Sequence, residues 1–190
     1  MGIDASARFV GMAQSLGGQA VHFLEHDLAG GVIPVGCVDV IFVHLLLAHL
    51  RSPREAVAGW TRALAPGGVM LIDEVETIET DNELLRDYLG LANHVVAARG
   101  ATMNAGPLVA DLGSLPQVAM LSSEVVEHSV AVSEAVEMFI MNFRTIRGDP
   151  SLREDFDALD AMAHGLRRLR GATSTQRVVW RMRQVALRAA

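Results

Sequence analysis

Four acidic side chains and one histidine each follow a short apolar run, at positions where a side chain is able to do chemistry. Asp4 and Asp27 follow the first two runs, His44 follows the third, and Asp73 and Glu74 end the fourth. An ionised carboxylate accepts hydrogen bonds from hydroxyl groups and amines, and histidine takes up and releases a proton near neutral pH. These residues could therefore hold a polar ligand or move a proton, provided that the fold brings them together.

Other catalytic arrangements are absent from the sequence. The single Cys37 excludes a cysteine-rich metal site, the one H-x-x-x-H spacing, His22 and His26, lies at the end of a predicted strand rather than on a helix, and no nucleophile, histidine and acid form a recognisable triad. We therefore expect no metal site. His49 lies one turn beyond His44, and we interpret it as a structural residue rather than as a base.

The elements that must position these side chains alternate between strands and helices in the first half of the chain. Ser52 and Pro53 predict a helix start, and the Pro-Gly-Gly turn at residues 66–68 predicts its end. Strands are predicted at the beginning of the chain up to Asp4, and at residues 20–25, 38–43 and 69–73, with helices at 7–16 and from 53. This alternation is typical of a parallel sheet with helices on both faces.

The second half begins with a long helical pattern and ends in an ambiguous segment. Ser133 predicts the cap of a helix, and residues 176–187 fit both a strand and a helix, of which we favour the strand. Further elements are predicted as helices at 81–99, 108–115, 133–147 and 149–170, and as a strand at 124–132. We expect a single domain over residues 1–190.

Composition excludes several classes of protein. The formal net charge is −6, whereas general nucleic-acid binding requires an excess of basic side chains. The arginines after residue 166 have a single aromatic residue among them, Trp180, rather than the several of a binding platform, so we interpret them as a solvated helix face and the exposed side of a last strand. No apolar run reaches the length of a bilayer span, and no secretory signal begins the chain. We expect a soluble, cytoplasmic protein that binds neither membranes nor nucleic acid.

Residues 39–74 carry a specific resemblance. The segment DVIFVHLLLAHLRSPREAVAGWTRALAPGGVMLIDE resembles the central part of class I S-adenosylmethionine-dependent methyltransferases that act on small molecules. Its features are an acid-containing strand, a turn rich in Leu and His, a helix, and the Leu-x-Pro-Gly-Gly turn at residues 64–68. Upstream, GIDAS and HDL resemble the ends of the second and third strands of that family. The resemblance implies a Rossmann-like, doubly wound, mostly parallel sheet.

The same resemblance implies S-adenosylmethionine as cosubstrate. Asp4, with Ala5 beside it, would bind the ribose, and Asp27 with the Leu28 backbone would hold the adenine edge. Val43 and His44 would line the space near the methionine part. For the two aspartates, the alternative is that each is a polar residue ending a strand in a loop. His44 is equally compatible with a residue that fills a turn.

The catalytic residues are not identified by the resemblance, and His44 and Glu74 are the candidates. Methyl transfer needs alignment more than acid-base groups. Glu74 ends its strand where an acceptor would approach. The region from residue 76 to 116 would supply acceptor specificity, with Met103, Asn104 and Leu108 lining a pocket. The alternative is that this region is ordinary helix packing. We divide the domain into a cosubstrate half, 1–76, and a substrate half, 77–190.

One family element has no counterpart in the sequence. The family begins with a strand that ends in a glycine-rich turn, followed by a helix, and that strand lies between those of Asp4 and Asp39. We expect one of three situations: the working enzyme is longer and this form is truncated, the chain is a non-catalytic binding or dimerising protein, or a partner or second copy supplies the element. A homodimer is thus among the expected assemblies.

Overall fold

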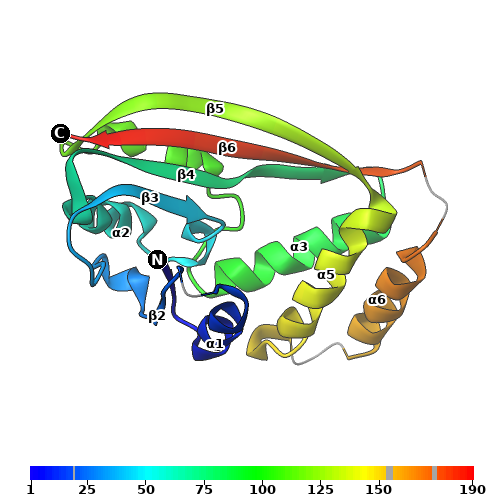
Figure 1. The fold of residues 1–190 in the computed structure, drawn as a ribbon. Coiled ribbons are helices and arrows are strands. Elements are labelled where there is room, and N and C mark those ends of the chain that lie inside the picture. Colours follow the sequence, from blue (N-terminus) through cyan, green and yellow to red (C-terminus); the bar gives the residue numbers. More distant parts are fainter. Residues whose placement is uncertain (19, 153–155, 173–174) are drawn as a thin grey trace.

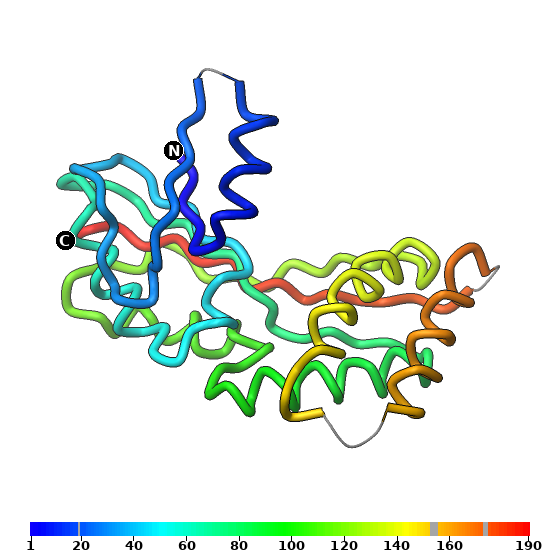
Figure 2. The backbone as a smooth tube through the Cα atoms, turned by 90° about the horizontal axis from the view of Figure 1, so that it is seen from below, coloured from blue at the N-terminus to red at the C-terminus, as the bar shows by residue number. Residues whose placement is uncertain are grey.

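The computed structural model describes residues 1–18, 20–152, 156–172 and 175–190, which form two sheets with surrounding helices (Figure 1). The N-terminal part is a small unit made of β1 (Gly2–Asp4), α1 (Ala7–Leu16) and β2 (Phe23–Glu25). The two strands pair in parallel, in a register that sets Asp4 opposite Glu25. Both strands therefore end at the same edge. Figure 2 shows α1 projecting from the body of the molecule.

The larger sheet has four strands in the order β3-β4-β6-β5. Their bounds are Val38–His44 for β3, Leu64–Thr80 for β4, Arg177–Ala189 for β6 and Val118–Ala131 for β5. β3 and β4 are parallel, because α2 (Pro53–Trp60) crosses between them, whereas β6 runs antiparallel to both of its neighbours. The predicted α/β, Rossmann-like fold is confirmed, and so is the strand predicted at 176–187.

No strand pairing joins the two sheets within the described residues. β1 and β3 therefore each have one edge without a strand partner. Next to this edge, Val40 and Phe42 of β3 are 57% and 66% exposed, on the face opposite the buried Val43. The prediction that one strand of the family is missing between β1 and β3 remains a prediction.

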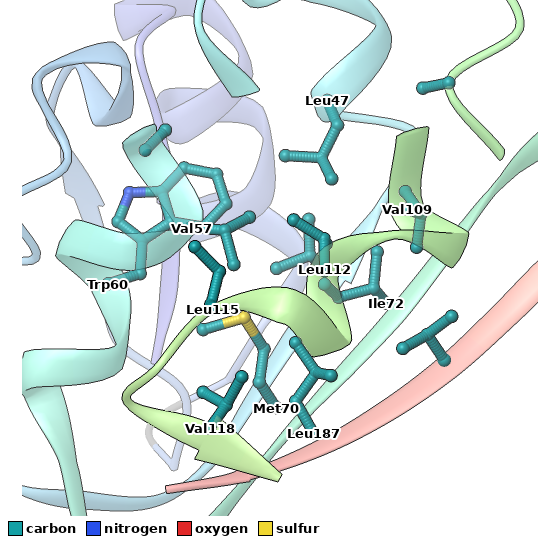
Figure 3. Close-up of a cluster of buried hydrophobic side chains, with 14 of the residues drawn as sticks. Leu47, Val57, Trp60, Met70, Ile72, Val109, Leu112, Leu115, Val118 and Leu187 are labelled. Atoms are coloured by element: carbon teal, nitrogen blue, oxygen red, sulfur yellow. The ribbon is translucent and has the colours of Figure 1, made fainter. Parts of the chain in front are cut away.

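A first hydrophobic core packs against one face of the sheet (Figure 3). Val57 and Trp60 of α2 and Val109 of α4 (Gly106–Ala110) meet Met70 and Ile72 of β4 there. All five side chains are at most 1% exposed, and burial of a large apolar side chain stabilises a fold by about 1.5–3 kcal/mol. This core holds the carboxyl end of β3 against the first half of β4.

A second core lies at the other end of the long strands, where α3 (Glu83–Ala98), α5 (Val132–Ile146) and α6 (Phe156–Leu169) pack together (Figure 1). Its centre is aromatic: Phe139 lies between Tyr88 and Trp180, with ring centroids 5.0 and 5.8 Å away. The helices predicted at 81–99 and 133–147 supply much of this core.

Several predicted boundaries were wrong. β4 does not end at residue 73 but continues to Thr80, because β6 pairs with it along that length. Ser133 is not a cap, since α5 begins at Val132 without a side-chain capping bond, and Ser52 precedes α2 without one either. The helix predicted from 149 is a 3-10 turn over Pro150–Leu152 and then α6; residues 153–155 lie outside the described residues.

A search for membrane spans found no helix of sufficient length and apolarity in the described part of the chain.

Candidate functional site

The exposed carboxylate of Asp4 stands at the end of β1 and is fixed by the start of α1. Its Oδ1 accepts a hydrogen bond from the Ser6 N–H at 2.7 Å, and the Ser6 hydroxyl in turn caps α1 by accepting from the Phe9 N–H. Ala5, between them, is exposed. Within the described residues Oδ2 of Asp4 makes no hydrogen bond, so it is free to accept one from a ligand.

Asp27 lies beyond the end of the neighbouring strand and has a similar arrangement. Its Oδ1 accepts from the Ala29 N–H at 2.9 Å, which caps a 3-10 turn at Leu28–Gly30. The Leu28 carbonyl accepts from the indole N–H of the buried Trp60 at 3.1 Å, and this bond attaches the turn to α2. Since β1 and β2 are adjacent and parallel, Asp4 and Asp27 lie at one edge of the small sheet.

His44 pairs with Asp73 at the corresponding edge of the large sheet. The two residues are opposite each other in the β3-β4 register, and 3.1 Å separates His44 Nδ1 from Asp73 Oδ2. The imidazole also stacks on Phe42, with 5.9 Å between the ring centroids. The His44 side chain is 49% exposed and that of Asp73 19%. A carboxylate on Nδ1 fixes the tautomer and leaves Nε2 as the proton acceptor.

Glu74 is fully buried, at 0% exposure. Its Oε1 accepts from the Leu46 and Leu47 N–H groups, both at 2.7 Å, whereas its Oε2 is buried without a hydrogen-bond partner in the described residues. Burial raises the pKa of this carboxyl, although the backbone bonds and His44 oppose the rise. The predicted contact with an acceptor is untested; the contacts observed are with the turn that follows β3.

The remaining predicted residues are distributed over both cores. Val43 is 4% exposed, with its side chain in the first core. Leu108 packs against that core and Met103 against the second, while Asn104 is exposed between them. His49 is exposed in the 3-10 turn Leu47–His49. The residues proposed for acceptor specificity thus connect the two cores.

Sequence reasoning placed Asp73 at the right edge but did not assign it a partner. Its contact with His44 depends on the register between β3 and β4. That register cannot be deduced from the sequence of each strand taken by itself. The positive φ of Leu45, 50°, was also missed. Two features of the sequence could have indicated this pair: the consecutive acids Asp73 and Glu74, and the histidine, His44, at the end of the preceding strand.

No group of three or more His, Cys, Asp or Glu side chains is arranged to hold a metal ion in the ranges that the structure describes.

Comparison with known proteins points to one family. Residues 1–72 match the family model described as a methyltransferase domain. A candidate methyltransferase from Bacillus halodurans C-125 superimposes with a TM-score of 0.60 at 9% identity, over 98% of this chain and 80% of that one. A search of curated proteins found no match.

Two further solved structures share the fold. The phosphoethanolamine N-methyltransferase 2 of Haemonchus contortus, solved with phosphomonomethylethanolamine and S-adenosylhomocysteine, has a TM-score of 0.54 at 15% identity. The [4+2]-cyclase SpnF has a TM-score of 0.53 at 17% identity. Each match covers 99% of this chain but only 43% and 64% of the other, so this chain spans less than two thirds of either protein.

The family match covers the strands and turns that carry Asp4, Asp27 and His44, and the structural matches cover nearly the whole chain. Residues 1–72 therefore resemble a methyltransferase domain, and the chain has the fold of the solved methyltransferase structures that it matches.

Proposed function

We propose that this protein transfers a methyl group from S-adenosylmethionine, the cosubstrate of the family, to a small-molecule acceptor, with His44 as the general base. The observation that carries the proposal is the pair of His44 and Asp73, 3.1 Å apart at the carboxyl end of β3, where Asp73 lies opposite within the longer β4. Ligands of open α/β sheets bind at that edge.

The residues at the strand ends fit the cosubstrate. Asp4 and Asp27 are exposed acceptors at one edge, and in each a backbone hydrogen bond fixes one carboxylate oxygen and leaves the other free. Vicinal hydroxyls suit Asp4, and an exocyclic amine suits Asp27. S-Adenosylmethionine would supply an electrophilic methyl group on a positively charged sulfur.

The chain's own residues would then move one proton. His44 Nε2 takes it from the oxygen or nitrogen of the acceptor as that atom forms its bond to the methyl carbon; the electron pair of the broken carbon-sulfur bond remains on sulfur. Asp73 holds Nδ1 and stabilises the imidazolium that results.

The test is an assay of S-adenosylhomocysteine formation with a panel of small alcohols, phenols and amines, each product being checked by mass for one added methyl group. H44A should lower turnover by about 10²–10⁴-fold, the usual contribution of a general base. The matched control is H49A, which removes an exposed histidine five residues away and should retain turnover. Equal turnover of H44A and wild type would exclude His44 as the base.

A second candidate is a methyltransferase-like protein without catalysis. The free edges of β1 and β3 favour it, because unpaired strand edges are templates for association with another chain. Binding of S-adenosylhomocysteine with no turnover of any acceptor, together with a dimer in solution, would support this alternative over the first.

A further inference from the structure

The turn after β3 contains a strained residue at a position where the strain needs an explanation. Leu45 has a φ of 50°, in the left-handed region that side chains other than glycine rarely adopt. It directly follows His44. Such a conformation persists only where the surrounding structure holds it, and it is concentrated at functional sites.

Two neighbouring acids of β4 hold this turn. The Asp73 backbone carbonyl accepts from the Leu45 N–H at 3.1 Å. Glu74 Oε1 accepts from the next two N–H groups, those of Leu46 and Leu47, at 2.7 Å each. The side chains of Asp73 and Glu74 point to opposite faces of the strand, so one contacts His44 and the other contacts the turn beyond it.

The burial of Glu74 is costly, and its hydrogen bonds to the turn after β3 are what offset that cost. A fully buried carboxyl costs free energy, and one of its oxygens has no partner in the described residues. Leu47 is already fixed by the first core, at 0% exposure. An apolar residue at position 74 would fill the same space, but it would leave two buried N–H groups without an acceptor and the strained Leu45 without support.

We propose that Glu74 is a positioning residue: it holds the turn at Leu45–Leu47 so that His44 stays against Asp73. The proposal rests on the proposed function only in that His44 is taken as the base. Glu74 itself does not touch the acceptor in this arrangement, and it acts through the backbone of Leu46 and Leu47.

The first test is hydrogen exchange of the peptide that contains residues 45–50, measured by mass spectrometry on the intact protein. E74A should accelerate exchange of that peptide by about tenfold or more, because two amides lose their acceptor. E74Q keeps one acceptor oxygen and should stay within about threefold of wild type. The matched control is E76Q, the same change two residues along β4, where Glu76 pairs with Arg183 and not with the turn; it should leave the peptide unchanged.

The second test reads the state of His44 itself. The rate of His44 acylation by diethyl pyrocarbonate, relative to that of the exposed His128 in the same sample, reports the nucleophilicity of the imidazole. A carboxylate on the opposite nitrogen raises that nucleophilicity, so E74A should lower the ratio by about threefold or more and E74Q should restore it. A merely stabilising Glu74 would lower the unfolding midpoint without moving this ratio.

Unchanged exchange of residues 45–50 in E74A would overturn the proposal, and so would faster exchange with an unchanged acylation ratio. If E74A does not fold, E74M, which fills the same space but also lacks the acceptor oxygen, is compared with E76Q, and only E74M should then alter either readout. Both readouts use the protein without cosubstrate or acceptor. A failed methyltransferase assay would therefore remove the proposed function and leave the positioning result intact.

Discussion

The imidazole of His44, at the end of β3, and the carboxylate of Asp73, within the parallel strand β4, lie opposite each other with 3.1 Å between Nδ1 and Oδ2. Asp73 is the less exposed of the two, and its other oxygen, Oδ1, is buried without a partner in the described residues. A buried carboxylate without a second partner is stabilised by an adjacent positive charge. The pair lies at the end of β3, the edge where ligands of open α/β sheets bind.

Asp73→Asn should distinguish two roles of Asp73: orienting the His44 ring through a hydrogen bond, and stabilising a positive charge on it. The amide oxygen can still accept the Nδ1–H bond but provides no negative charge to stabilise an imidazolium. Turnover should fall by about 10²-fold or more while the affinity for S-adenosylhomocysteine changes little. Steady-state kinetics with calorimetric binding measures both; equal losses of turnover and affinity would contradict a role confined to His44.

Gly59→Ala should loosen the attachment of the N-terminal unit. A Cβ at position 59 would lie 2.0 Å from the Gly31 carbonyl oxygen, and Gly31 ends the turn that begins at Leu28, with a φ of 70°. Backbone on both sides must then shift, which costs about 1–3 kcal/mol for overpacking of this kind. Urea denaturation should show the loss in unfolding free energy.

The control for that variant is Gly90→Ala. Gly90 is exposed within α3, and a Cβ there meets no atom within 4 Å. The change should raise the unfolding free energy by about 0.5–1 kcal/mol, because alanine loses less backbone entropy in a helix. If both variants shifted stability alike, the contact between Gly31 and Gly59 would have no role in docking.

Asp149 should make stability depend on acid pH. Hydrogen bonds from the Ser151 hydroxyl and N–H, and then the Arg99 guanidinium, lower the pKa of Asp149 to about 2. A lowered folded-state pKa gives stability that is present above the unfolded value, 3.8, and is lost as pH falls through about 2. The advantage of wild type over D149N should therefore shrink over this range in urea titrations. A constant advantage would contradict the assigned bonds.

Local patterns predicted the helices better than the long strands. The bounds of α1 and α3 are properties of single segments, and both helices were predicted closely, at 7–16 and 81–99. The extension of β4 to Thr80 was not, because its charged residues resemble a loop. They are tolerated in the strand since Arg183 and Arg181 of β6 lie beside Glu76 and Glu79. The interpretation of the late arginines as the exposed side of a strand fits Arg181, which is 42% exposed, but not Arg183, which is 18% exposed in its pair with Glu76.

For the candidate site, the sequence predicted where individual residues lie but not which of them contact one another. Strand ends placed Asp4, Asp27 and His44 at the edges where they stand. The bond from His44 to Asp73 and the buried contacts of Glu74 depend on strand register and on a strained turn. Neither follows from residue spacing, because both arise from which strands become neighbours.

The most direct measurement is calorimetric titration of the protein with S-adenosylhomocysteine, in wild type and in D4N, D27N and D39N. The account predicts that wild type binds, and that D4N and D27N each lose about tenfold or more in affinity through a lost hydrogen bond to a charged acceptor. D39N changes an exposed acid near the start of β3, away from the strand ends, and should bind as wild type does. No binding by wild type, or equal binding by all four proteins, would contradict the account.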